Sequence, residues 1–224
     1  AVPQPRAADG CKVEEEVKIL QSEARRQYYA PLVEWGIHHP NALHRARMAL
    51  ALGRIGPQTF DDANGDGVKD EGERQAGVSQ LVTLVNDPDA NVRATAAFAL
   101  GQIGDPTSID ALLQFANDAN GDVGGEAVEA LSKLAANVPL ARYAAFTAAQ
   151  MPAGIRAHAI RFLFRFKSDD ASMIAADALA SPSPRIREET TYALARRAFA
   201  AARPRLQLHV HEPTPRPRAD PMSA

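Results

Sequence analysis

Short segments with apolar residues at helical spacing recur along this chain. Four of them, at residues 92–100, 123–131, 155–163 and 186–194, begin with valine or isoleucine and end with leucine. A fifth, at residues 44–52, begins the series. The closing leucines are separated by 48, 31, 32 and 31 residues. Apolar positions three and four residues apart predict amphipathic helices, and their return at a nearly fixed period predicts a repeat architecture.

A shorter helix precedes each of these segments, so the pattern predicts a series of helical pairs. Turns rich in Asp, Asn, Ser and Pro separate the two helices of a pair. The predicted pairs are 32–38 with 42–54, 78–85 with 92–103, 109–116 with 123–135, 140–149 with 155–166, and 171–179 with 186–198. Units of this kind pack mainly on their neighbours and build an elongated array. We therefore expect an all-α fold, an α-solenoid of about five helical pairs.

The chain divides into three parts on this pattern. Residues 1–26 are expected to form an extended segment and a lead-in helix, and residues 27–199 the solenoid. Residues 200–224 form a Pro-rich tail, because five prolines between Arg203 and Ala224 do not allow the helices to continue. Apolar and polar residues alternate over 205–211, which is typical of a β-strand. This segment either lies extended on the solenoid or pairs with a strand of another copy.

The first interval between closing leucines is 17 residues longer than the next, and an insertion at residues 58–74 accounts for the difference. The insertion contains the sequence DANGDGVKDEGE, which offers oxygen ligands at the spacing of a twelve-residue calcium loop. Gly67 occupies the sixth position, where the chain must turn sharply. The predicted ligands are the side chains of Asp62, Asn64, Asp66, Asp70 and Glu73 and the backbone carbonyl of Val68.

This segment resembles EF-hand loops and the calcium loops of bacterial dockerins and thrombospondin-type repeats. Lys69 stands where paired EF-hands carry a β-branched apolar residue, so a lone structural loop fits better than a paired sensor. We expect Ca²⁺ to neutralise carboxylates that otherwise repel one another, to order the insertion, and to fix the first unit on the second. The alternative is a hydrated acidic loop without a metal, because Asp, Asn and Gly are also common turn residues.

A second acidic run, at residues 118–122, begins like the calcium loop. Val123 replaces the glycine of the sixth position, and the repeat places this valine at the start of a helix. We therefore expect an ordinary turn between helices, with Asp122 capping the helix that follows.

The repeating sequence V/I-R-x-x-A-x-x-A-L resembles HEAT repeats, in the short bacterial form that also occurs in phycobilisome lyases. The resemblance extends over about residues 27–199 and implies the solenoid fold, while it leaves the activity open. In that family, an arginine at the start of the second helix commonly bonds to an aspartate in a turn and joins adjacent units. The matching arginines here are Arg45, Arg93, Arg156 and Arg187. Gly124 takes this position in one unit, which leaves open a looser junction or another use of the site.

The net charge of −2 hides an uneven distribution. Residues 1–140 carry 12 Lys and Arg against 20 Asp and Glu, whereas residues 141–224 carry 13 against 7. The two regions may differ only in solvation, or their opposite charges could favour head-to-tail contact between copies. No nucleic-acid-binding motif accompanies the arginines, and no apolar run is long enough to span a bilayer. The single cysteine excludes a disulfide framework within the chain.

These features favour a non-enzymatic structural protein that acts through protein contacts and self-assembles, with Ca²⁺ as its cofactor. We expect other copies of the chain to be its partners, head to tail and through the C-terminal tail. A monomeric adaptor that binds another protein on its concave surface is the alternative, and a lyase-like enzyme is a weaker one. Ala1 in place of Met and the calcium loop favour an extracellular or periplasmic protein whose signal peptide has been removed.

Overall fold

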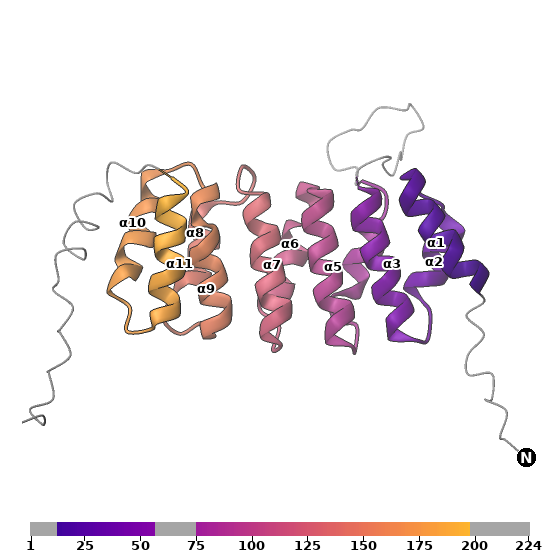
Figure 1. Ribbon diagram of the computed structural model, residues 1–224, viewed down its shortest axis with the longest axis horizontal. Helices are drawn as coiled ribbons and strands as arrows, with labels where there is room; N and C mark the ends of the chain where they lie inside the picture. The colour runs from indigo at the N-terminus through magenta and orange to yellow at the C-terminus, as the bar shows by residue number, and fades with distance from the viewer. Residues whose placement is uncertain (1–12, 57–74, 198–224) are drawn as a thin grey trace, which may run out of the picture.

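A computed structural model describes residues 13–56 and 75–197, and its helices form two layers in one elongated array (Figure 1). The front layer contains α1 (Val13–Arg25), α3 (Ala42–Ile55), α5 (Ala90–Ile103), α7 (Gly121–Lys133), α9 (Ala153–Phe162) and α11 (Pro184–Ala195). The back layer contains α2 (Ala30–Ile37), α4 (Val78–Thr83), α6 (Ile109–Ala116), α8 (Leu140–Ala144) and α10 (Asp169–Asp177). Each front helix contacts the next one along the chain. The predicted all-α solenoid is confirmed for these residues.

Short 3₁₀ segments end several helices. They follow α4, α8, α9 and α10 at Leu84–Asn86, Ala145–Thr147, Leu163–Arg165 and Ala178–Ala180, and a fifth, Pro106–Ser108, precedes α6. The back-layer helices α4 and α8 therefore end as α-helices before the positions that the sequence pattern predicts, and the 3₁₀ turns complete them. Such a turn satisfies terminal backbone groups with tighter hydrogen bonds.

Side chains in the turns set where the front helices begin. The carboxylate of Asp89 accepts hydrogen bonds from the backbone N–H groups of Asn91 and Val92, at the start of α5. Asn120 does the same for α7, where its side-chain oxygen accepts from Asp122 and Val123. Asn120 rather than Asp122 is therefore the capping residue, so that detail of the prediction is wrong. The ordinary turn predicted for residues 118–122 is present.

The core lies between the two layers and follows the repeat. All five closing leucines are buried, namely Leu52, Leu100, Leu131, Leu163 and Leu194. Each such side chain contributes about 1.5–3 kcal/mol when it leaves water. The alanines of the front helices lie at the contacts between units, where their small side chains allow the helices to pack closely.

Two joints of the front layer depend on glycine facing alanine. A Cβ at Gly53 would lie 2.9 Å from the Cβ of Ala99, and one at Gly101 would lie 2.6 Å from the Cβ of Ala130. These distances are shorter than side chains tolerate, so α3, α5 and α7 approach as closely as they do because both positions are glycine. One repeat further on, Ser132 takes the position of Gly101.

Helix α9 differs from its counterparts at its C-terminal end. Phe162 and Phe164 occupy positions that hold Ala130 and Ser132 one unit earlier. The α-helix ends at Phe162, which is buried, and the following 3₁₀ turn leaves Phe164 and Arg165 partly exposed on the front face. This end of α9 supplies much of the surface described next.

Candidate interaction surface

The six residues predicted to bind calcium, Asp62, Asn64, Asp66, Val68, Asp70 and Glu73, lie outside the described residues. The same is true of the segment 205–211, for which a strand is predicted. Within residues 13–56 and 75–197, no group of three or more His, Cys, Asp or Glu side chains is arranged to hold a metal ion. The structure therefore describes the two residues that flank the insertion and not the insertion itself.

The C-terminal flank of the insertion is bound to the body of the array. The backbone N–H of Gln75 donates a hydrogen bond to Oδ2 of Asp105, with a length of 2.6 Å. Asp105 is only 2 % exposed and also accepts from the backbone N–H and the hydroxyl of Thr107. Gly77 follows with a φ of 88°, and a Cβ there would lie 2.9 Å from Leu52. These contacts hold the end of the insertion between the first unit and the turn before α6.

Two arginines join adjacent units as the family resemblance implies. Arg45 on α3 donates two hydrogen bonds to Asp87, with lengths of 2.6 and 2.8 Å. Arg93 on α5 donates to Asp118 in the same way, at 2.6 and 3.0 Å. The Nη1 of Arg45 also donates to the carbonyl oxygens of His39 and Pro40, in the turn of its own unit. Each guanidinium therefore ties its own turn to the turn of the next unit.

The carboxylates of these pairs are shifted toward their ionised forms. Burial raises the pKa of Asp87, but hydrogen bonds from Arg45 and the Asp89 backbone, with nearby arginine charges, lower it below its ordinary value. The hydrogen bond from Arg93 lowers the pKa of Asp118, and burial opposes this effect only in part. Both pairs are charge-assisted and bidentate, which is the strongest form of such a contact.

The other two arginines of the series do not bind an aspartate, so this part of the expectation is wrong. The Nε of Arg156 donates to the carbonyl oxygen of Thr147 at 3.0 Å. Arg187 donates to the carbonyl oxygens of Ser181 and Pro182, which belong to its own turn. The reason is local, because Ser181 takes the position that Asp87 and Asp118 hold in earlier units and offers no carboxylate.

Gly124 is required by close packing. A Cβ at this position would lie 2.4 Å from Cδ1 of Ile155 on α9 and 3.2 Å from the carbonyl oxygen of Ala116. The isoleucine fills the space beside α7 where an arginine would have to begin. Of the two interpretations left open by the sequence, a looser junction at this position does not agree with the structure.

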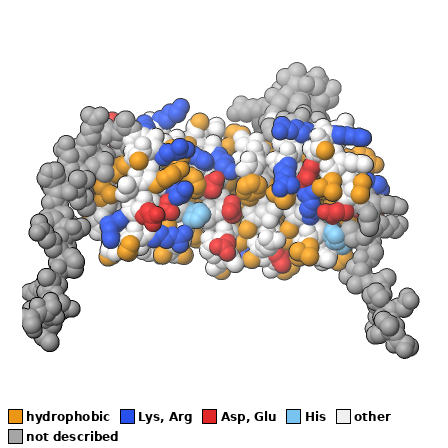
Figure 2. Space-filling model, viewed as in Figure 1, with side chains coloured by type: hydrophobic (Ala, Val, Ile, Leu, Met, Phe, Trp, Pro, Cys, Tyr) orange, Lys and Arg blue, Asp and Glu red, His pale blue; other side chains and the backbone are white. Residues whose placement is uncertain are grey.

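The front face carries cations at one repeated position. Four of the five residues at this position are basic, and together we call them the basic row: Arg54, Lys133, Arg165 and Arg196. Gln102 takes the position on α5. Neighbouring helices in contact lie about 8–10 Å apart, so adjacent members of the row are separated by roughly that distance. Figure 2 views this face and shows Lys and Arg side chains gathered over α9 and α11, with apolar side chains between them.

Three arginines and three aromatic rings meet at the C-terminal end of this face. We call them the arginine–aromatic cluster: Arg161, Phe162, Phe164, Arg165, Tyr192 and Arg196. Arg161 stacks on Tyr192, with 4.0 Å from Cζ to the ring centre. Arg165 lies 4.8 Å from the Phe162 ring, and Arg196 lies 5.3 Å from the Phe164 ring. Cation–π contacts of this kind hold each guanidinium in a defined orientation.

An open groove continues the cluster toward α7. It has a volume of about 560 Å³ and is lined by Ser132, Lys133, Ala135, Ala136, Phe164, Arg165 and Lys167. The guanidinium of Arg165 donates a hydrogen bond of 2.9 Å to the hydroxyl of Ser132, across the groove from η4 to α7. Three of the lining side chains are basic and none is acidic. The groove therefore has a positive potential beside an apolar ring.

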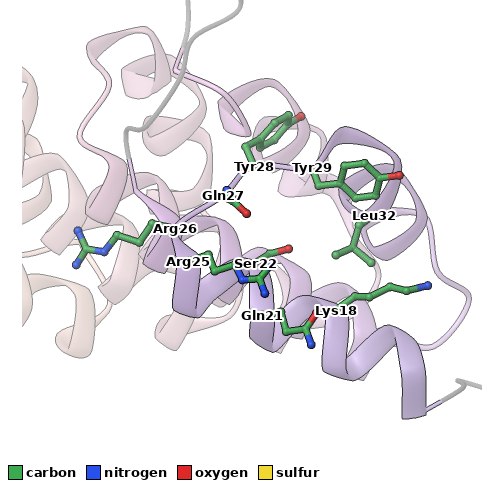
Figure 3. Close-up of a pocket in the computed structure, with 9 residues that line it drawn as sticks. All are labelled: Lys18, Gln21, Ser22, Arg25, Arg26, Gln27, Tyr28, Tyr29 and Leu32. Carbon is green, nitrogen blue, oxygen red and sulfur yellow. The ribbon is translucent and has the colours of Figure 1, made fainter.

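A second open pocket lies at the N-terminal end, between α1 and α2. It has a volume of about 640 Å³, and Figure 3 shows its lining residues. Lys18 and Arg26 are directed to opposite sides of this pocket (Figure 3). The polar groups therefore do not converge on one point, as a site for a small ligand requires.

Charge along the array changes sign in the middle rather than at the first unit. Residues 75–140 carry 8 acidic and 2 basic residues, whereas residues 141–197 carry 5 acidic and 9 basic ones. Residues 13–56 are nearly balanced, with 5 acidic and 6 basic residues. The acidic part of the described chain is therefore the stretch from α4 to α7, which adjoins the basic cluster.

Sequence reasoning did not identify the arginine–aromatic cluster. The signal was present in the repeat register, because Lys133, Arg165 and Arg196 follow one another at intervals of 32 and 31 residues. Reading that column beside Phe164 and Tyr192 would have placed cations and rings on one face. The predicted series of second-helix arginines was read from the same alignment of units, at a different column.

Comparisons with known proteins agree with this architecture. Residues 78–142 match the family model for HEAT repeats, so the middle of the chain carries repeats of this kind. The comparison with curated proteins finds no match. None of the helices in the described part of the chain has the length and apolar character needed to cross a membrane.

Several solved structures are similar at low sequence identity. An engineered protein is 16 % identical with a TM-score of 0.49, over 87 % of this chain and 94 % of its own. The complex of CpcE and CpcF of phycocyanin lyase from Nostoc sp. is 16 % identical with a TM-score of 0.49, over 96 % of this chain and 95 % of that one. Human deoxyhypusine hydroxylase is 20 % identical with a TM-score of 0.35, over 90 % and 80 %.

Proposed function

We propose that this protein is a non-enzymatic scaffold that acts through protein–protein contacts, is stabilised by calcium and assembles with copies of itself. The observation that carries the proposal is the array itself. Its front helices form one continuous face, and that face carries stacked arginine and aromatic side chains rather than a closed pocket with converging polar groups. Arginine and tyrosine are the residues that most often dominate binding at protein interfaces.

The calcium part of the proposal rests on the sequence of residues 62–73 and on the anchoring of the insertion. The five side-chain ligands and Gly67 agree with the twelve-residue pattern. Asp105 holds Gln75 at the C-terminal flank, so order in the loop would be transmitted to the packing of the first unit on the second. Loops of extracellular modules bind Ca²⁺ at about 10⁻⁴–10⁻³ M, which supports an extracellular or periplasmic location.

The self-assembly part is supported by the apolar surface of α1. Val17 and Leu20 expose 42 % and 50 % of their surface on this helix, which is the first of the front layer. Arrays of repeats normally need end units with polar outer faces to remain soluble as separate molecules. An apolar first helix therefore favours packing against a further copy, and the C-terminal tail is the proposed connector.

Electron microscopy and light scattering of the purified chain, with and without calcium, test the proposal. We expect long polymers in calcium and smaller species in a chelator. A uniform monomer in both conditions would contradict self-assembly and favour the alternative, a monomeric adaptor. Titration calorimetry tests the metal separately, and an absence of heat on adding Ca²⁺ would remove the calcium part of the proposal.

A further inference from the structure

The arginine–aromatic cluster carries positive charge that the described part of the chain does not neutralise. Arg161 forms an ion pair of 2.6 Å with Glu189. Among residues 13–56 and 75–197, no carboxylate lies within ion-pair distance of Arg165 or Arg196. These two guanidiniums are therefore available to an acidic group from outside this part of the molecule.

Stacking prepares both guanidiniums for such a group. Arg165 lies over the Phe162 and Phe164 rings, at 4.8 and 5.7 Å from their centres. Arg196 lies between Phe164 and Tyr192, at 5.3 and 5.6 Å. A planar guanidinium that rests on a ring keeps its N–H edge free and loses less conformational entropy when it binds a carboxylate with two parallel hydrogen bonds.

The adjoining groove extends this surface with charge of the same sign. Lys133 and Lys167 line it together with Arg165, and Phe164 supplies an apolar wall. Lys133 is partly neutralised by Glu129, which lies 3.4 Å away, whereas Lys167 is exposed. The groove can therefore hold an acidic side chain and an apolar side chain next to each other.

We propose that the arginine–aromatic cluster and the groove beside it bind an acidic polypeptide segment of a partner protein, with carboxylates on Arg165 and Arg196 and an apolar side chain against Phe164. This proposal rests on the proposed function, because it assigns a partner class to the face of a protein-binding scaffold. Charge complementarity sets the class, and the rings select a segment that is apolar as well as acidic.

The extent of the surface favours a short segment over a long polyanion. The cluster and groove cover α7 to α11, and with helices about 8–10 Å apart they are roughly 20 Å long. An extended chain advances about 3.3 Å per residue, so six or seven residues cover this distance. Toward the N-terminus a nucleic acid would meet the acidic residues of α7, namely Asp122, Glu126 and Glu129. The arginines also cover the ring faces on which bases would stack.

Fluorescence anisotropy with the full chain in calcium tests the proposal. The probe is a labelled twelve-residue peptide in which glutamate alternates with leucine and serine. The comparison probes are a peptide with lysine in place of glutamate, a peptide with glycine in place of leucine, and a twelve-nucleotide single-stranded DNA. We expect the first peptide to bind most tightly and its affinity to fall as salt rises.

Matched variants locate the site. Arg165→Glu combined with Arg196→Glu should weaken binding about tenfold or more, whereas Arg25→Glu combined with Arg142→Glu should leave it unchanged. The control pair makes the same change in total charge at other places on the surface. Tyr192→Ala should weaken binding, and Tyr29→Ala, at a tyrosine that is 57 % exposed on α2's N-terminal side, should not. Thermal melts of each variant show that the fold is retained.

Three results would overturn the proposal. These are no binding of the acidic peptide, equal loss in the Arg165/Arg196 and Arg25/Arg142 pairs, or tighter binding of the DNA with the same sensitivity to Arg165 and Arg196. Polymers that form normally in the same preparation would leave the proposed scaffold function standing when the peptide result is negative.

Discussion

At the scale of single residues, one arginine position joins the first three units. Arg45 and Arg93 each bond to the carbonyl oxygens of their own turn and to the aspartate of the next turn, so one side chain fixes two loops. Both aspartate side chains are largely buried. Removing one partner of such a pair leaves the other charge without compensation.

We therefore expect Asp87→Ala and Asp118→Ala each to lower the free energy of unfolding by about 2–3 kcal/mol. Urea denaturation followed by circular dichroism measures this. Asp110→Ala serves as the control, because Asp110 is exposed and its contact with Arg142 is long, at 3.4 Å. A change at Asp110 as large as that at Asp118 would show that the inter-unit pairs have no special weight.

The same pairs predict how stability depends on acid. The pKa values of Asp87 and Asp118 are lower in the folded chain than their ordinary value of 3.8. Their contribution is therefore complete above about pH 4 and is lost as the pH falls through the folded pKa values. We expect the native chain to lose stability more steeply below pH 4 than Asp118→Asn does. Parallel curves for the two proteins in that range would contradict this.

Adjacent glycines on α7 offer a second test at this scale. A Cβ at Gly124 would lie 2.4 Å from Ile155, whereas one at Gly125 would lie 3.4 Å from the His158 ring, an ordinary contact. We expect Gly124→Ala to lower stability by about 1 kcal/mol, because overpacking outweighs the gain in helix propensity. Gly125→Ala should be neutral or slightly stabilising. Thermal unfolding of the two variants measures the difference, and equal midpoints would contradict the role given to Gly124.

At the scale of elements, the repeat period was enough to predict the helices but not how each one ends. Leucine and alanine at fixed intervals specify which face of a helix is buried, and that pattern survives in every unit. The 3₁₀ turns after α4, α8 and α9 depend on local packing that has no period. At α9 the cause is visible, because Phe162 and Phe164 are too large for the positions of Ala130 and Ser132.

The candidate surface was less predictable for the same reason. Arg45 and Arg93 could be assigned from the family pattern because their acceptors recur at a fixed distance in the chain. The arginine–aromatic cluster depends on which side chains of neighbouring units face the same side. A column of the repeat gives the cations, but only the structure shows Arg161 on Tyr192 and Arg196 on Phe164.

The insertion is the element with the clearest test. We expect saturating Ca²⁺ to raise the free energy of unfolding by about 2.7 kcal/mol at a hundredfold excess over the dissociation constant. Asp62→Asn combined with Glu73→Gln should abolish this gain and the calorimetric heat. Asp61→Asn is the control, because it removes an adjacent carboxylate outside the predicted ligand set. Retention of calcium binding in the double variant would contradict the ligand assignment.

At the scale of the whole molecule, the tail is the proposed connector between copies. Truncation before Leu206 removes the segment 206–211 and should abolish polymers in electron micrographs, because the alternating residues that could pair with another copy are lost. Truncation after His211 keeps this segment and removes three of the tail's prolines beyond it along with the rest of residues 212–224. We expect the second variant to polymerise. Polymers of the first variant would rule out the tail as connector.

The contact between α7 and α9 divides the array mechanically. Among the described residues no ion pair joins these two helices, whereas Arg45 and Arg93 clamp the first two joints and Arg161 clamps the last. The isoleucine against Gly124 and the hydrogen bond from Arg165 to Ser132 hold this joint instead. Apolar contact has no preferred direction, so the joint resists bending less than a bidentate clamp does. The molecule is thus two stiff rods of opposite charge that meet at a hinge.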